Sequence, residues 1–450
     1  MKKIFLVIVT SILAWGCAED DFGTNSGGLG TVPYTITAVY NSKVPAANTT
    51  IKLTNISSTD VYELKTDENG FAYIENILPG TYNITATNTL NAKEFKDQFG
   101  YDETSDEIIF NGTLNNTVIS SKFEPGKINL IQSKTGDLVI KQIYYAGSDT
   151  SRGASTRDHF VEIYNNSNQT LYADGLYFAL LHGATTNTPS AANAPYCLPT
   201  GQWDWSKSKG MSVISGNANT DYVYADYVVQ IPGNGTQYPI EPGKSIIIAQ
   251  TAINHKQPLS NDGKDYTIDN PELTVDLSNV EFEAYLGDFR KSIGKDPFAS
   301  DVDNPMVPNV GISFWGIPGA YFGGTDLLFN PQGNDSFIIF KDVDFINYKF
   351  FPMPNVVTIN ASTPHYIQIP VSKIIDGVDV QNFKPSNYRP KMLPDNIDAS
   401  TTSVSNQFNS NSVMRKIKST TPDGRIILQD TNNSAEDFIE MKATPKGFAQ

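Results

Sequence analysis

Short alternating runs of apolar and polar residues are the feature that most restricts how this chain can fold. Such runs occupy residues 50–54, 138–143 and 245–249, and glycine, proline, asparagine or aspartate lies between them. Successive side chains of a strand point to opposite faces, so alternation over four to eight residues predicts half-buried strands. Long apolar patterns with a helical period are absent, and residues 281–291 are the best helix candidate. We therefore predict an all-β chain that folds into sandwiches.

The first sixteen residues predict a secretory signal peptide. Lys2 and Lys3 precede an apolar run over residues 4–13, and Gly16 follows close behind. A basic start, a short apolar run and a small residue before the cut are typical of such signals. The run is too short to span a bilayer, which takes about 20 apolar residues.

The residues after the signal predict a membrane anchor and a tether. Cys17 directly follows Gly16 and resembles the cysteine of the bacterial lipobox, which is acylated and becomes the mature N-terminus. Two or three acyl chains would hold the protein on a membrane durably. The acidic residues 18–21 resemble the signal that sends Bacteroidota lipoproteins to the outer face of the outer membrane. The alternatives are an ordinary cleaved signal and a solvated acidic segment; in either case residues 17–32 form an acidic, Gly-rich tether.

Residues 33–124 predict a small sandwich close to the anchor. Asn69-Gly70 and Pro79-Gly80 fit tight turns between strands. The stretch from Thr66 to Ile84 resembles the carboxypeptidase regulatory-like (transthyretin-like) family. The resemblance implies a β-sandwich that serves as a rigid support, with a docking module as the alternative.

Residues 136–450 predict a second, larger sandwich. Segments 137–147, 158–178, 241–249, 335–340 and 374–378 resemble, in order, the strands of the lamin-tail domain, an immunoglobulin-like sandwich. Residues 413–417 and 430–438 resemble its closing motif, in which Arg415 would pair with a carboxylate. The combination with the first unit resembles a family of uncharacterised Bacteroidota surface lipoproteins.

Two long insertions interrupt the second sandwich, at about residues 184–238 and 253–332. Loops on a rigid scaffold often carry function, and exposed aromatic patches often mark interaction sites. Both insertions are rich in aromatic residues, and we take four of these as candidate ligand contacts: Trp203, Trp205, Trp315 and Tyr321. The alternative is that these side chains belong to the core.

Motifs for catalysis or cofactor binding are absent from the sequence. There is no Gly-x-Ser-x-Gly elbow, and Cys197 has no surrounding signature of a thiol enzyme. Calcium is the ion to expect if one binds, because Asp301 and Asp303 place carboxylates at alternating positions. The alternative for this pair is a solvated acidic turn.

These features together predict a non-enzymatic, lipid-anchored protein on the exterior of the outer membrane. It would bind a nutrient, a glycan or a membrane protein, and one form of this hypothesis makes it an accessory of a TonB-dependent transporter. The formal net charge of −15 disfavours nucleic acid as a partner. The alternatives are a hydrolase with its site in the insertions and a purely structural or adhesive surface protein.

Overall fold

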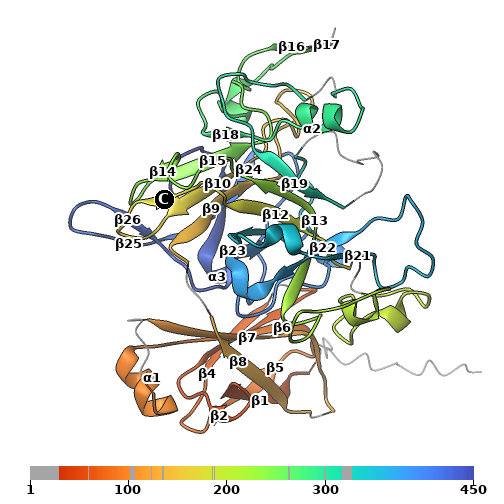
Figure 1. The fold of residues 1–450 in the computed structure, drawn as a ribbon. Coiled ribbons are helices and arrows are strands. Elements are labelled where there is room, and N and C mark those ends of the chain that lie inside the picture. Colours follow the sequence, from red (N-terminus) through yellow and green to blue (C-terminus); the bar gives the residue numbers. More distant parts are fainter. Residues whose placement is uncertain are drawn as a thin grey trace, which may run out of the picture.

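The computed structural model describes residues 30–58, 60–101, 107–122, 124–133, 136–184, 186, 188–261, 264–297, 301–316 and 327–449 (Figure 1). The predicted signal peptide, Cys17 and nearly all of the tether lie outside these residues. The chain is built of β-sheets with a few short helices, so the all-β prediction is confirmed. None of the helices in these ranges is both apolar enough and long enough to cross a bilayer.

The first sandwich is an eight-stranded sheet in the order β2-β1-β8-β7-β6-β3-β4, with β5 also paired to β1. Its strands are β1 (Val32–Tyr40), β2 (Val44–Pro45), β3 (Thr50–Asn55), β4 (Val61–Lys65), β5 (Phe71–Ile77), β6 (Gly80–Leu90), β7 (Ile108–Ile119) and β8 (Gly126–Gln132). They surround a core that includes Ile36, Leu53 and Ile84. On β6 the apolar side chains alternate with outward-facing threonine and asparagine, as period-two burial requires.

Helix α1 (Ala92–Phe99) closes one end of this core and was not predicted from the sequence. Asn91 caps it with a reciprocal capping box to Glu94, and Gly100 ends it in the left-handed conformation. Phe95 is its buried residue, and Phe99 stacks on Phe110 with ring centroids 5.4 Å apart, so two aromatic side chains fix the helix to the sandwich. The expected helix at residues 281–291 is shorter than predicted, because only α2 (Gly287–Ser292) is helical there.

The second sandwich consists of two sheets packed face to face. The six-stranded sheet has the order β18-β15-β10-β9-β24-β27, and the other has the order β21-β22-β13-β12-β20-β23, with β19 paired to β13. The six strands of the first are β9 (Leu138–Tyr144), β10 (Phe160–Asn165), β15 (Ser245–Ala249), β18 (Phe282–Glu283), β24 (Asn411–Arg415) and β27 (Phe438–Lys442). The strands of the second are β12 (Tyr177–Leu181), β13 (Tyr222–Gln230), β19 (Gly311–Trp315), β20 (Ser336–Phe340), β21 (Phe350–Phe351), β22 (Tyr366–Pro370) and β23 (Ile374–Asp379).

Both sheets contribute to one large apolar core. Ile140 and Ile163 from the first sheet and Phe178 and Ile339 from the second lie in it. Smaller elements cover the edges: β11 (Leu171–Tyr172), β14 (Pro239–Ile240), β16 (Leu259–Asn261), β17 (Lys264–Tyr266), β25 (Ile417–Thr420), β26 (Ile426–Leu428) and α3 (Ser434–Asp437), with 3-10 turns at Ala194–Tyr196, Trp205–Lys207, Pro271–Leu273, Phe345–Asn347, Val371–Lys373 and Pro385–Asn387.

The segments expected to be insertions are partly sheet. The first contains β13, which pairs with β12 and β22 along its length, and the second contributes β18 and β19 to the two sheets. The side chains of β13 are largely buried, as expected for an inner strand of the sheet. The irregular parts of the first segment are therefore the stretch before residue 222 and the short loop at 231–238.

Candidate ligand-binding cleft

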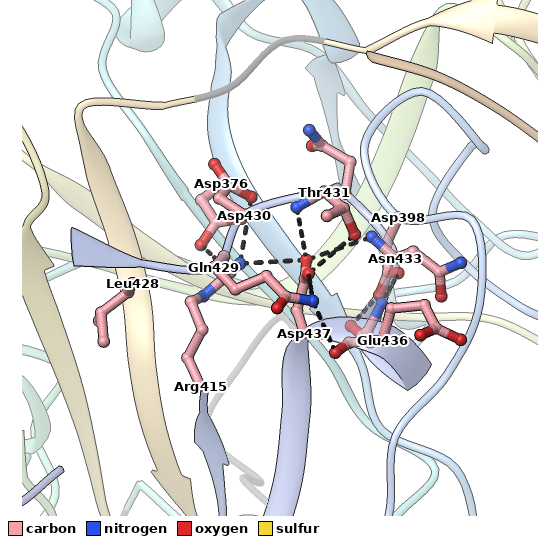
Figure 2. Close-up of polar contacts among 12 residues, drawn as sticks. Asp376, Asp398, Arg415, Leu428, Gln429, Asp430, Thr431, Asn433, Glu436 and Asp437 are labelled. Atoms are coloured by element: carbon pink, nitrogen blue, oxygen red, sulfur yellow. Dashed lines mark hydrogen bonds and ion pairs between the residues drawn. The ribbon is translucent and has the colours of Figure 1, made fainter. Parts of the chain in front are cut away.

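The buried Arg415, the last residue of β24, organises the end of the chain (Figure 2). Its side chain is almost fully enclosed, with Nη2 2.7 Å from Asp376 Oδ2 and Nη1 3.1 Å from Asp430 Oδ1 and 3.3 Å from Asp437 Oδ2. Its Nε also donates a 2.9 Å hydrogen bond to the Ile140 carbonyl. The prediction that Arg415 pairs with a carboxylate of the closing motif is confirmed. Asp376 lies on β23 of the other sheet, within a segment that resembles the lamin-tail domain, but the sequence did not indicate that it pairs with Arg415.

Three carboxylates around one guanidinium leave an excess of negative charge. Burial raises the pKa of Asp376 and of Asp437 to about 7, although Arg415 acts in the opposite direction. Burial alone would lower the pKa of Arg415, but the carboxylates outweigh it and hold that pKa above its ordinary value. Near neutral pH a fraction of the two aspartates is therefore protonated, which offsets the excess charge.

The loop held by this network rests against the first sandwich. Asn111 Nδ2 on β7 donates a 2.6 Å hydrogen bond to the Thr431 carbonyl, and Asn111 Oδ1 accepts from Thr87 Oγ1 at 2.7 Å. Lys52 Nζ on β3 lies 2.7 Å from Glu436 Oε1. The contact between the sandwiches is thus polar, and the closing motif of one sandwich forms part of it.

A cleft lies beside this contact, where the two sandwiches separate. Thr113 Oγ1 donates to the Ala399 carbonyl, and Thr113 and the neighbouring Ser400 both line the cleft. The cleft is small and open to solvent, with a cavity volume of about 40 Å³. The first sandwich contributes side chains from β6 and β7: Asn83, Thr85, Thr113, Asn115 and Asn116.

A β-bulge shapes the wall formed by the first sandwich. The register between β6 and β7 shifts between Tyr82 and Ile84, so Asn115 and Asn116 lie opposite Asn83. Asn116 has a φ of 54°, a conformation that asparagine tolerates better than most residues, and its N–H donates to Asn83 Oδ1 at 3.1 Å. Bulges redirect side chains, and this one places three amide groups at the cleft.

The opposite wall consists of loops that are fixed by glutamine side chains. Gln381 Nε2 donates to the Arg389 carbonyl at 2.8 Å, and Gln381 Oε1 accepts from the Arg389 N–H at 2.9 Å. Gln202 Nε2 donates to the Lys391 carbonyl at 2.7 Å. Tyr388 is partly buried in this wall, and burial raises its pKa. Both walls are therefore held in place by hydrogen bonds.

Most side chains of the lining are uncharged and polar. Amide and hydroxyl groups can both donate and accept hydrogen bonds, and the phenol of Tyr388 adds an aromatic ring. Thr200 and Thr401 complete a lining in which Arg389 and Lys391 are the charged residues. Such a cleft suits an uncharged ligand rich in hydroxyl groups, because few of its groups would demand a charged partner.

The aromatic residues chosen from the sequence lie elsewhere. Trp203 and Trp205 are only 6% and 7% exposed, and Trp205 stacks on Tyr224 with ring centroids 3.8 Å apart. They do not form an exposed aromatic surface but the small core under their own loop, which is the alternative stated for them above. Trp315 is half-buried against Tyr227, and Tyr321 lies outside the described residues.

The candidate calcium ligands do not form a recognisable metal centre. Asp301 is buried and accepts from the Leu286 N–H at 2.9 Å, whereas Asp303 is exposed and accepts from Asn309 Nδ2 at 3.1 Å. Within the described ranges, no group of three or more histidine, cysteine, aspartate or glutamate side chains is arranged to hold a metal ion.

The thiol of Cys197 lies in a setting that does not favour its ionisation. The residue is half-buried, and burial raises its pKa. A thiol of this kind is a poor nucleophile, since the thiolate is the reactive form.

Comparisons with known proteins give one family match and several similar solved structures. Residues 241–446, less than half of the chain, match the model of a family described as "Protein of unknown function (DUF4876)". No curated protein matches the chain. A DUF4876 family protein from Bacteroides thetaiotaomicron is a similar solved structure, with 25% identity, coverage of 91% of this chain and 94% of that one, and a TM-score of 0.48.

Two further solved structures resemble smaller parts of the chain. Fervidolysin from Fervidobacterium pennivorans has 11% identity and a TM-score of 0.18, covering 45% of this chain and 25% of its own. A DUF3823 family protein from Bacteroides ovatus has 12% identity and a TM-score of 0.14, covering 48% of this chain and 98% of its own.

Proposed function

We propose that this chain is a non-enzymatic, lipid-anchored protein of the outer-membrane surface that binds an uncharged glycan between its two sandwiches. The observation that carries the proposal is the cleft lined by amide and hydroxyl side chains from both bodies. Each hydroxyl group of a sugar can donate and accept hydrogen bonds, and the side chains of asparagine, glutamine and threonine can do the same. The ring of Tyr388 offers a flat apolar face for the C–H side of a sugar.

The rigidity of the walls supports binding. Gln381 and Gln202 fix the loops of one wall, and the bulge at Asn116 is built into the β6–β7 pair of the other. A preformed site loses less conformational entropy when the ligand binds, so a shallow polar cleft can still reach useful affinity.

A glycan array with the chain from residue 18 onward, followed by calorimetry on the hits, tests the binding proposal. We expect one class of neutral oligosaccharide to bind, and Tyr388→Ala to weaken its affinity about fivefold to tenfold, as loss of an aromatic contact does. Tyr73→Ala is the matched control, since Tyr73 is 58% exposed on β5 of the first sandwich. An array without hits, or equal affinities for Tyr388→Ala and the unsubstituted chain, would contradict the proposal.

The same samples distinguish binding from hydrolysis. Chromatography of each bound oligosaccharide after prolonged incubation should return the starting compound unchanged. Appearance of shorter products that depend on the protein would replace the binding proposal with the hydrolase alternative.

The anchor is tested separately, on Cys17. We expect mass spectrometry of the native protein to find a diacylated or triacylated cysteine as the first residue, and protease treatment of intact cells to remove the protein. An unmodified Cys17, or resistance to the protease, would contradict this part and leave the cleft unaffected.

A further inference from the structure

Exposed apolar side chains gather in one segment of the second sandwich. Val343, Ile346, Phe350, Val357 and Ile359 are 96%, 89%, 54%, 72% and 42% exposed. Seventeen large apolar residues are exposed in the described ranges, and five of them fall within these seventeen positions. Single exposed apolar residues are ordinary, but such a concentration indicates an interaction surface.

A second loop lies against this segment and adds positive charge. Lys209 Nζ donates to the Val357 carbonyl at 3.0 Å, and Lys349 Nζ donates to Ser212 Oγ at 3.0 Å. Ile214, which is 80% exposed, follows on the same loop. Both loops lie beside β21 and β22, on one side of the second sandwich (Figure 1). We call the set of Lys209, Ile214, Lys349, Phe350 and Val357 the basic apolar patch.

The patch itself carries positive charge, although the chain as a whole has 48 acidic and 33 basic residues. Residues 205–220 and 345–375 contain four lysines, while Asp204, Asp221, Asp344 and Asp376 lie directly outside these ranges. Lys207 and Lys373 pair with Asp204 and Asp342. In the described part of the chain, Lys209 and Lys349 have no carboxylate partner within 4 Å, so their charge is available to a partner.

We propose that the basic apolar patch docks onto an anionic lipid surface. Such a surface carries negative headgroups above an apolar interior, and the patch complements both. The lysine ammonium groups would contact phosphates while Phe350, Val357 and Ile214 insert at the boundary with the acyl chains. The contact is independent of the ligand proposed for the cleft. It would hold the second sandwich against the bilayer in addition to the expected anchor at Cys17.

Flotation with lipid vesicles tests the proposal, using the chain from residue 18, which retains every described residue and lacks acyl groups. We expect binding to vesicles of phosphatidylcholine with about one third phosphatidylglycerol, and loss of about fivefold in the partition coefficient for each of Lys209→Gln and Lys349→Gln. Vesicles of phosphatidylcholine alone should bind less, and added salt should weaken the binding.

The apolar contribution is tested with a double variant and a matched control. Phe350→Ser with Val357→Ser should abolish flotation, whereas Phe71→Ser with Val118→Ser, at 47% and 70% exposed sites on the first sandwich, should leave it unchanged. Unchanged thermal unfolding would show that each variant is folded. Equal flotation of both double variants, or none by the unsubstituted chain, would overturn the proposal. Light scattering gives a further test. A dimer of the unsubstituted chain that only the patch variants convert to a monomer would also overturn the proposal, since a second copy of the chain would then cover this surface.

Discussion

At the scale of single residues, the buried charges of the second sandwich set its sensitivity to substitution. Arg415 contacts carboxylates from β23 and from the closing motif, and these charges have almost no access to water. Removing charges from water costs several kcal/mol per ion, so such a network contributes little net stability when complete. It becomes costly when one partner is removed, because the remaining charges stay buried.

The variant Arg415→Met should lower the free energy of unfolding by about 3–5 kcal/mol. Urea denaturation at pH 7 measures this change. Lys418→Met is the control, because the Lys418 side chain is 45% exposed and its pair with Glu107 should contribute less than about 1 kcal/mol. A loss for Arg415→Met no larger than the control would show that the aspartates accommodate the missing cation.

Asp301 should make the protein less stable as the pH rises. Burial, followed by the nearby charges of Glu283 and Asp303, raises its pKa to about 7. Between pH 3.8 and about pH 7, the folded state therefore keeps a proton on Asp301 that the unfolded state has released. This stabilising contribution is complete below about pH 4 and is lost as the pH rises through 7.

Asp301→Asn should remove that dependence while it keeps the shape of the side chain. The loss of stability between pH 5 and pH 8, measured by urea denaturation, should be about 1–3 kcal/mol smaller than in the unsubstituted chain. Asp97→Asn, at a 63% exposed site of the first sandwich, should retain the original slope. An unchanged slope for Asp301→Asn would contradict the assignment.

At the scale of elements, aromatic packing fixes the irregular loop before β13. Trp205 stacks on Tyr224 of β13, and its backbone N–H donates to Asn219 Oδ1 at 2.7 Å. Apart from the 3-10 turns, the described residues between 188 and 218 have no helix or strand. Their order therefore depends on side chains for which the sequence left both a ligand contact and a core position open.

Trp205→Ala should release this loop. We expect amide hydrogen exchange within residues 188–218 to accelerate strongly, with a loss of about 3–5 kcal/mol for the truncated side chain. Phe71→Ala, at an exposed site on β5, should leave exchange in the loop unchanged. Protection that persists in Trp205→Ala would show that backbone contacts alone hold the loop.

The sequence predicted most strands but not their boundaries with the loops. The alternation in β3 and β6 was sufficient, because one face of each strand is more deeply buried than the other. β9 and β15 were also predicted as strands, but both of their faces are buried. The pattern failed at β13, where both faces are covered and alternation disappears, and at α1, whose eight residues carry one buried side chain. The capping pattern of Asn91 and Glu94 was the available signal for α1.

At the scale of the whole molecule, the two sandwiches have separate cores. Among the described residues, no apolar cluster includes side chains from both, and hydrogen bonds and ion pairs such as Lys52–Glu436 join them. Differential scanning calorimetry should therefore show two transitions, with Arg415→Met lowering one of them. A single transition with equal calorimetric and van't Hoff enthalpies would show that the polar contact is enough to make unfolding cooperative.

The cleft could not be predicted from the sequence, because its walls are distant along the chain. Asn116 and Arg389 are ordinary polar residues until the sandwiches meet, and no spacing connects them. The outward-facing threonine and asparagine residues of β6 were visible as a polar stripe. A polar stripe of this kind fits a strand face exposed to solvent as well as a wall of a cleft. Only the position of the second sandwich distinguishes these two alternatives.

The separate cores have a mechanical consequence. Since each wall of the cleft belongs to its own sandwich, a ligand bound in the proposed site would contact both sandwiches and restrict the movement of one relative to the other. A partner protein that contacts both sandwiches could then respond to the bound ligand without touching it.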